Sequence, residues 1–488
     1  MRLSFILPMA ALFVLPSVLP AQPEPAKSLF FVAATSQSAR FLQPWEKNQP
    51  QRKRGMGALI PGNRVLVTAE LTVDSTYIEL ERPGDGIKAT ARVTARDYEC
   101  NLAVVEPIKD AAKFFEGAVP LEIDTPAKAG DELEVWQLED DGSPIVTKGN
   151  LLRVELGSYF LPDRSFLRYE FKASLQNKAG SFIIPAVRGG KLTGILLGYN
   201  SDDQIADILP APIMRKFLDD AADGTYQGFA TIGVRYARTT DTQFRQWLGL
   251  PDDVGGIYLS KVVKKASADA AGLQEGDVIL AMDGFDIDRR GYYKDPDFGP
   301  LNFGHLITGR KNVGETLKVT VWRDKKKVEV PVKLMRQNAE DFLVDPWMFD
   351  RGPRYLVAGG LVFTELTRPF IRSFRDWEKN APVSLRHIEL NPEQYSEGRQ
   401  KVVILAYMIP TKANIGYERI TTTVVEEVNG KKIGSIRDLN KALLSPVKGV
   451  HEIKVTAPDP VIYIDSALAA EVDEQLMAKG LKPLSRLD

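Results

Sequence analysis

The chain has 488 residues, and its 63 lysine and arginine side chains are balanced by 64 aspartate and glutamate side chains. With 44% hydrophobic and 26% charged residues, it has the composition of an ordinary globular protein, and its length predicts about three domains. The neutral balance gives no support to a nucleic-acid or anionic-membrane partner. The single cysteine, Cys100, excludes an intrachain disulfide and a cysteine-based metal site.

The first residues differ in kind from the rest of the chain. Arg2 precedes a mostly apolar stretch, Leu3 to Leu19, and Leu19-Pro20-Ala21 offers a small-residue cleavage site. This pattern predicts a secretory signal peptide over residues 1–21. The stretch is short for a membrane span and no other segment is apolar enough, so we expect a secreted mature chain without a membrane span. The periplasm is the expected compartment, although the sequence does not separate it from the extracellular space.

Residues 28–222 carry the pattern of many short strands. Small apolar residues alternate with polar ones at Ala89, Ala91, Val93 and Ala95, which is the period of a half-buried strand. Short strands separated by turn residues predict an all-β barrel or sandwich. Pro212 to Asp220 predicts a helix that closes this unit, with proline in its first turn.

A second unit covers residues 226–337 and ends in a clear hairpin. Leu317, Val319 and Val321 alternate with polar residues, a turn follows at residues 323–326, and a second alternating strand returns from Val328. Residues 338–354 form the expected linker to a third unit.

The third unit covers residues 355–457, and a strand–helix tail follows over residues 458–488. Ser435 to Asp438 is a capping box that predicts a helix start, and the tail predicts a strand at 461–464 and a helix at 466–479. Both later units carry a turn after a strand, Asp283-Gly284 in one and Asn429-Gly430 in the other. We interpret them as a duplicated module.

One segment carries a specific resemblance. Ala266 to Leu273, followed by Glu275-Gly276-Asp277-Val278-Ile279, resembles a PDZ domain of the HtrA type. In PDZ domains a ligand's C-terminal segment adds a strand to the sheet edge, and a loop of backbone N–H groups holds its carboxylate. The resemblance implies that the ligand lies between the matching segment and a helix near residues 303–307. The implied peptide-binding residues are Phe229, Ala230, Thr231, Ile232, Gly233, Val234 and His305.

Two simpler interpretations stay open for this site. The segment 229–234 is also consistent with an ordinary strand whose edge is covered by the module's own chain. His305 is also consistent with a surface histidine without a role in binding. In the third unit, Gly359-Gly360-Leu361-Val362 is consistent with a carboxylate loop, but the helix–glycine–aspartate signature is absent, so we favour subunit assembly there.

Nearly the whole mature chain is similar to the HtrA/Deg protease family. The segments 291–300, 357–364 and 414–418 resemble the plant Deg branch with two PDZ domains. The resemblance implies a mainly β fold, with a trypsin-like double β-barrel followed by two PDZ domains, the second degenerate. It also implies a homo-oligomer.

The resemblance also locates the family's three catalytic positions. Leu71 follows Val67-Thr68-Ala69-Glu70 and takes the place of the histidine, although a one-residue shift would place Glu70 there. Asn101 precedes Leu102-Ala103-Val104, where the family has aspartate. Lys178 replaces the nucleophilic serine, and Gln176 replaces a glycine of the oxyanion loop.

The histidine count supports the loss of the triad without any alignment. The chain has three histidines, His305, His387 and His451, and none lies in the first 304 residues. A Ser-His-Asp mechanism needs an imidazole within hydrogen-bond reach of the hydroxyl. Lys178 and Ser181 could form an unorthodox pair, but Ser181 stands beyond the nucleophile position. The histidines have no metal-ligand spacing, so we expect neither a metal nor another cofactor.

These observations predict a non-catalytic HtrA/Deg homologue, a pseudoprotease, in envelope protein quality control. We expect it to bind protein C-termini or unfolded polypeptides as a chaperone, an adaptor or a regulator of an active Deg homologue. The alternatives are a serine-type endopeptidase with an unorthodox residual site and an oligomeric scaffold that binds no free peptide.

Overall fold

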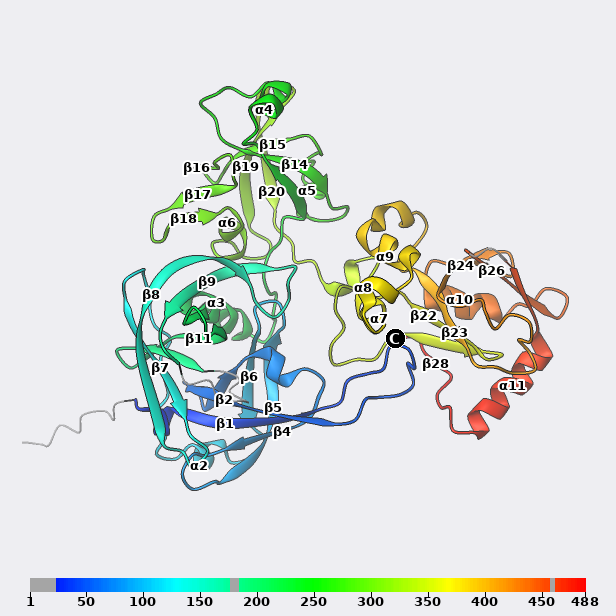
Figure 1. Cartoon of the computed structure of the whole chain (residues 1–488), viewed down its shortest axis with the longest axis horizontal. Coiled ribbons are helices and arrows are strands. Elements are labelled where there is room, and N and C mark those ends of the chain that lie inside the picture. Colours follow the sequence, from blue (N-terminus) through cyan, green and yellow to red (C-terminus); the bar gives the residue numbers. More distant parts are fainter. Residues whose placement is uncertain (1–22, 176–183, 457–460) are drawn as a thin grey trace, which may run out of the picture.

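The computed structural model describes residues 23–175, 184–456 and 461–488. Figure 1 shows two barrels side by side in blue and cyan, a green module above the cyan barrel, and a yellow-to-red module beside them. The predicted signal peptide lies outside the described residues. Strands outnumber helices throughout, which confirms the prediction of a mainly β fold.

Barrel 1 is a closed barrel in the order β1-β2-β3-β6-β5-β4. Its strands are β1 (Leu29–Ser36), β2 (Gln51–Ile60), β3 (Arg64–Val67), β4 (Ser75–Glu81), β5 (Lys88–Asp97) and β6 (Leu102–Pro107). The helices of this part of the chain are α1 (Pro25–Ser28), the 3-10 helix η1 (Ala69–Thr72) and α2 (Ala111–Phe114). The alternating segment identified in the sequence forms β5.

Barrel 2 is also closed, in the order β10-β11-β12-β9-β8-β7. Its strands are β7 (Glu132–Leu138), β8 (Pro144–Ser158), β9 (Ser165–Lys172), β10 (Pro185–Arg188), β11 (Lys191–Asn200) and β12 (Ile205–Pro210). Helix α3 (Ala211–Ala221) follows, and proline occupies its first turn as predicted. The two barrels form the double β-barrel that the sequence predicts.

Module 1 is the unit of residues 226–337, and its sheet runs β13-β14-β15-β19-β20 with β16 paired to β15. Its strands are β13 (Val234–Arg238), β14 (Ile257–Val262), β15 (Val278–Met282), β16 (Phe285–Asp286), β17 (Tyr292–Asp295), β18 (Gly299–Asn302), β19 (Thr316–Arg323) and β20 (Lys326–Lys333). Its helices are α4 (Thr242–Leu248), α5 (Ser267–Ala270) and α6 (Gly304–Thr308). The predicted hairpin is β19–β20, in which Val319 pairs with Val330.

Module 2 covers residues 355–488, and its sheet runs β27-β26-β24-β23-β22-β21-β28 with β25 paired to β24. Its strands are β21 (Tyr355–Ala358), β22 (Leu361–Glu365), β23 (Val403–Met408), β24 (Thr423–Val428), β25 (Lys431–Lys432), β26 (Val450–Val455), β27 (Val461–Asp465) and β28 (Ser485–Arg486). Its helices are α7 (Arg368–Arg372), α8 (Trp377–Asn380), α9 (Val383–Leu390), η3 (Pro392–Tyr395), α10 (Ile436–Leu443) and α11 (Ser466–Ala478); η2 (Ala339–Asp341) lies in the linker.

Two sequence expectations for module 2 can be compared with this sheet. Ser435 accepts a hydrogen bond from the Asp438 amide at the start of α10, as the capping box predicts. The sheet continues past residue 457, where the sequence places a boundary, because β27 pairs with β26 and β28 pairs with β21.

Module 1 and the barrels share buried contacts. The rings of Phe166 in barrel 2 and Phe229 in module 1 meet edge to face with centroids 4.9 Å apart. Lys216 of α3 donates a 2.8 Å hydrogen bond to the Thr308 carbonyl at the end of α6. The buried carboxylate of Asp97, at the end of β5, accepts hydrogen bonds from Tyr226 and Arg336 at the two ends of module 1. These contacts fix how module 1 sits on the barrels.

Module 2 is held to the barrels by a different set of side chains. Trp45, on the loop between β1 and β2, packs against Tyr355 and Tyr407 with ring centroids 6.2 and 6.1 Å away. Arg486 of β28 donates to the Pro44 carbonyl at 3.4 Å. The last strand of the chain therefore lies against a loop of barrel 1.

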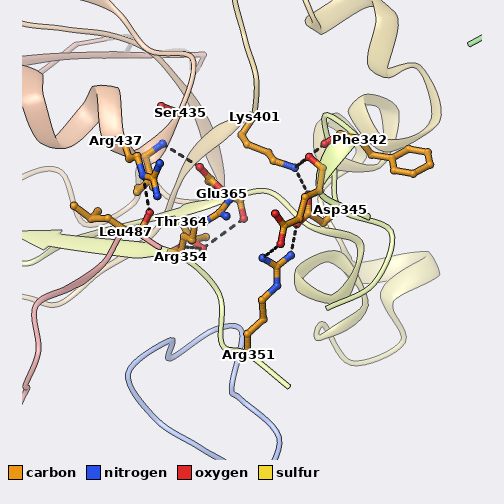
Figure 2. Close-up of polar contacts among 12 residues, drawn as sticks. Phe342, Asp345, Arg351, Arg354, Thr364, Glu365, Lys401, Ser435, Arg437 and Leu487 are labelled. Carbon is orange, nitrogen blue, oxygen red and sulfur yellow. Dashed lines mark hydrogen bonds and ion pairs between the residues drawn. The ribbon is translucent and has the colours of Figure 1, made fainter. Parts of the chain in front are cut away.

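A buried ion pair joins the linker to module 2. Lys401 pairs with Asp345, and both side chains are less than a tenth exposed; Asp345 also pairs with Arg351 at 3.2 Å (Figure 2). The Lys401 ammonium donates further hydrogen bonds to the carbonyls of Glu340 and Phe342 at 3.0 and 2.7 Å. The charge is therefore fully hydrogen-bonded, as burial of an ammonium requires.

Lys401→Ala should destabilise module 2 by about 3 kcal/mol, because removing one partner of a buried ion pair leaves the other charge in a poorly solvated site. Chemical denaturation of the full chain, followed by tryptophan fluorescence, measures the loss. The matched control is Lys412→Ala, which breaks a surface pair with Glu471 whose two side chains are about half exposed. That change should cost less than about 1 kcal/mol, and equal effects of the two substitutions would contradict the prediction.

Candidate functional site

The structure brings together two of the three residues that the sequence resemblance places at the family's catalytic positions. Leu71 lies in η1, directly after β3, and its side chain is fully buried. Asn101 precedes β6 and is 2% exposed. Its side-chain oxygen accepts a 2.9 Å hydrogen bond from the Glu70 amide, and its carbonyl accepts one of 3.1 Å from the Ala69 amide. Asn101 therefore supports the turn that carries Leu71.

The chemistry of these two residues differs from that of a histidine and an aspartate. The Leu71 side chain has no atom that accepts a proton, and a carboxamide such as that of Asn101 does not ionise. The third position, Lys178, lies outside the described residues, as do Gln176 and Ser181. The two described positions thus provide no general base for a hydroxyl nucleophile.

Cys100, which neighbours Asn101, is not an alternative nucleophile. Its side chain is fully buried, and burial, together with the charge of Asp97, raises the pKa of the thiol well above its ordinary value. A thiol that stays protonated is a poor nucleophile. Cys100 is therefore a core residue of barrel 1.

The strand β13 of module 1 has an open edge. It pairs with β14 on one side and with no other strand among those described. The predicted binding segment precedes it, and Thr231 is anchored there by a 2.9 Å hydrogen bond from its amide to the Met335 carbonyl. Among the described residues, the amides of Ile232 and Gly233 have no backbone carbonyl as acceptor. Free amides beside an open strand edge are what a peptide carboxylate would need.

The predicted binding residues do not all face this edge. Phe229 and Ala230 are buried, and Phe229 packs against Phe166 of barrel 2. The part of the segment next to the edge is therefore residues 232–234, followed by the exposed residues of β13. On this strand Tyr236 packs edge to face against Phe303, at 5.0 Å, just before α6.

His305, the other predicted binding residue, is 5% exposed. Its ring lies 3.9 Å from the Asp295 carboxylate and 6.1 Å, centroid to centroid, from the Phe298 ring. Burial lowers the pKa of the imidazole to about 4; Asp295 and Asp297 oppose the shift, and Arg310 and Lys216 add to it. His305 is thus a neutral interior side chain near neutral pH, where no ligand hydroxyl reaches it without rearrangement.

The corresponding edge of module 2 is filled. The sheet orders β13-β14-β15-β19-β20 and β22-β23-β24-β26-β27 match, so β22 is the counterpart of β13. Gly359 and Gly360, at φ 59° and 87°, form the tight turn of a hairpin in which β21 pairs with β22. The candidate carboxylate loop of module 2 is therefore a hairpin turn, and the module's own strand lies where a ligand would add.

Polar contacts hold this filled edge in place (Figure 2). Glu365 of β22 accepts a 3.2 Å hydrogen bond from the Ile436 amide at the start of α10 and pairs with Arg354 at 3.2 Å. Arg437 of α10 donates to the Leu487 carbonyl at 3.1 Å. The C-terminal residues thus cover the outer edge of β21. Helix α10 is hydrogen-bonded to β22 through Glu365 and to the C-terminal segment through Leu487.

Among the described residues, no group of three or more histidine, cysteine, aspartate or glutamate side chains is arranged to hold a metal ion. None of the described helices has the length and apolar character needed to cross a membrane.

Comparison with known protein families agrees with the two modules. Residues 230–334 and residues 344–481 each match a PDZ domain family. The chain is 28% identical to the putative protease Do-like 3, mitochondrial, of Arabidopsis thaliana, over 93% of this chain and 78% of that protein. It is 27% identical to protease Do-like 4, mitochondrial, of the same plant, over 82% and 73%. A solved structure of the HtrA-type protease AlgW with decapeptide is 18% identical and covers 64% of this chain and 96% of that one, with a TM-score of 0.46.

The fold and the comparisons define the class: a trypsin-like double barrel followed by two PDZ domains. Within that class, the chain is similar over most of its length to the Do-like proteases of the HtrA/Deg-like family.

Asn101→Ala should destabilise barrel 1 by about 2 kcal/mol. It removes the acceptor of the Glu70 amide and places a Cβ-bearing residue without a local hydrogen bond at φ 55°. Asn101→Gly loses the same hydrogen bond but has no penalty at positive φ, so it should cost about 1 kcal/mol. Thermal unfolding of both variants separates the contribution of the hydrogen bond from that of the positive φ. If Asn101→Ala left the stability unchanged, Asn101 would not stabilise η1.

His305 should make stability fall with acid. Its folded pKa of about 4 lies below the ordinary histidine pKa of 6.5, so the unfolded chain binds more protons between these values. Stability therefore rises with pH across this window and is lost as pH falls from about 6.5 to about 4, by up to about 3 kcal/mol. Melting curves at about pH 7 and about pH 4.5 should show a smaller acid loss for His305→Gln than for the native chain. Equal losses would show that the ring is not buried.

Proposed function

We propose that this chain is a catalytically inactive HtrA/Deg homologue that binds C-termini or unfolded segments of proteins. In this role it acts as a chaperone, an adaptor or a regulator of an active homologue in envelope protein quality control. The observation that carries the proposal is the absence of histidine from the first 304 residues, together with Leu71 and Asn101 at two of the catalytic positions.

The chemical argument for inactivity is quantitative. Loss of triad members lowers the rate by roughly 10⁴-fold or more, because nothing else takes the proton from the nucleophile. Two candidate substitutes are ruled out by burial: Cys100 is a buried thiol, and His305 is an interior side chain of module 1.

The argument for peptide binding rests on module 1. Its strand β13 offers an open edge, and the free amides of Ile232 and Gly233 lie at the start of that edge. An extended peptide gains main-chain hydrogen bonds along such an edge. The solved AlgW structure named above contains a decapeptide. Our proposal includes peptide binding by the present chain.

Module 2 has a different role in this proposal. Because β21 fills the edge that is open in module 1, we assign module 2 to assembly, between the parts of one chain or between subunits of a homo-oligomer. If module 1 also failed to bind free peptides, the chain would be the oligomeric scaffold that the sequence leaves open.

A serine-type endopeptidase is the second candidate, and the comparisons favour it. Both of the Arabidopsis relatives above are named as proteases. In this chain the reaction would need an unorthodox site, for which Lys178 and Ser181 are the available groups in the nucleophile segment.

The compartment is also a proposal. The signal-peptide pattern of residues 1–21 favours export, with the periplasm as the destination. The two relatives are named as mitochondrial proteins, so their compartment differs from the one we propose.

The proposal predicts that the mature chain does not degrade an unfolded model protein over hours, as followed on a gel. Three controls accompany it: Leu71→His/Asn101→Asp/Lys178→Ser as a restored triad, and the single changes Lys178→Ala and Ser181→Ala. Cleavage that either single change abolishes would establish the endopeptidase and refute the proposal. Cleavage that survives both would indicate a contaminating protease or a nucleophile elsewhere in the chain.

A further inference from the structure

The open edge of β13 is basic. Arg235 and Arg238 are exposed on this short strand, and neither forms an ion pair or a side-chain hydrogen bond with any residue that the structure describes. Lys261 lies on the neighbouring strand β14, directly opposite Arg235 in the register. Both guanidinium groups are exposed beside an edge that can accept a strand, so they are available to carboxylates on that strand.

The chain itself already places one carboxylate next to these cations. Glu393 of η3, in module 2, forms a 2.7 Å ion pair with Lys261. Burial raises the pKa of Glu393, but the hydrogen bonds from Lys261 and from its own backbone amide, with the charges of Lys261 and Arg235, outweigh burial and lower the pKa. Lys261, which lies opposite Arg235 in the register, therefore stabilises an anionic side chain, and Glu393 pairs with it in the free chain.

The geometry of an added strand sets which ligand residues meet these cations. A peptide antiparallel to β13, with its carboxylate at the Ile232 and Gly233 amides, runs past Arg235 close to its C-terminus and past Arg238 further upstream. Side chains directly opposite each other on paired strands lie close enough to interact, and opposite charges there are stabilising. The apolar contact on this edge comes from Tyr236, packed on Phe303.

We propose that the β13 edge of module 1 selects peptides that carry aspartate or glutamate in the residues preceding the C-terminus. Arg235 and Arg238 are the specificity-determining residues, and Glu393 is an internal competitor for Lys261 and Arg235. This inference rests on the proposed binding of C-terminal segments by module 1 and names the class of segment that binds.

The test uses the full mature chain and two fluorescent peptides of about seven residues. Both peptides end in the same apolar residue; one has glutamates at the preceding positions and the other has lysines. Fluorescence polarisation should show about 10-fold tighter binding of the acidic peptide, and the difference should shrink as salt screens the charges. The salt series needs no variant, so it does not depend on the folding of a mutant.

Three variants locate the effect. Arg235→Glu/Arg238→Glu should remove or reverse the preference, whereas Glu393→Gln should tighten the acidic peptide by about 2-fold. The matched control is Lys327→Glu, since Lys327 is exposed on β20 at the opposite end of the sheet and should change nothing.

The outcomes separate this inference from the function on which it rests. Equal affinity for the two peptides, or a preference that survives the double charge reversal, would overturn the acidic specificity and leave peptide binding intact. If neither peptide binds, peptide capture by module 1 is itself refuted, and the specificity with it.

Discussion

The arrangement of the barrels and module 1 depends on one buried carboxylate. Asp97 ends β5, is 2% exposed, and accepts hydrogen bonds from the amides of Glu99 and Cys100 in its own loop. Its other oxygen accepts from the Tyr226 hydroxyl at 2.5 Å and from Arg336 at 3.3 Å. The same loop ends at Asn101, so a single carboxylate connects the turn that carries Leu71 with both ends of module 1. A carboxylate with this many donors is costly to remove, because its partners would be left buried and unsatisfied.

The two modules differ in how the equivalent edge of their sheets is covered. A free edge is a row of unpaired N–H and C=O groups, which a folded protein either covers or uses. Module 2 covers its edge with β21, and then covers β21 with the last residues of the chain. Module 1 leaves β13 open and lines it with charged residues. The difference follows from one short hairpin: the two glycines at 359 and 360 turn the chain back onto β22, and no equivalent turn precedes β13.

The sequence predicts the features that depend on neighbouring residues. The β19–β20 hairpin, the serine cap of α10 and the helix after barrel 2 all have local signals, namely alternation, a capping box and a proline in the first turn. The absence of histidine from the first 304 residues can be read directly from the sequence. These signals and the family resemblance together suffice for the double barrel and the two modules.

What the sequence does not predict depends on contacts between distant segments. Alternation of polar residues cannot reveal that Glu393 lies against Lys261, more than a hundred residues away, or that Phe229 packs on barrel 2. The sequence leaves His305 open as a ligand contact or a surface histidine; in the structure it is neither, because it is buried beside Asp295 and Phe298 of the β17–β18 hairpin. The basic character of β13 is visible in the sequence as Val234-Arg235-Tyr236-Ala237-Arg238, but the resemblance places the binding segment at residues 229–234, and the strand order shows that the open edge continues to Arg238.

Leu71 also has a consequence for how this chain can change over evolutionary time. At a position where the family has histidine, the side chain is now part of the core of barrel 1, with no exposed surface. A leucine buried in this way stabilises the fold by about 2 kcal/mol or more, and an imidazole in the same apolar space would need hydrogen-bond partners for both of its ring nitrogens. A change of Leu71 to histidine would therefore lower the stability of barrel 1 before it could contribute to any chemistry. The packing of this one side chain is thus itself an obstacle to the gain of a catalytic imidazole at this position.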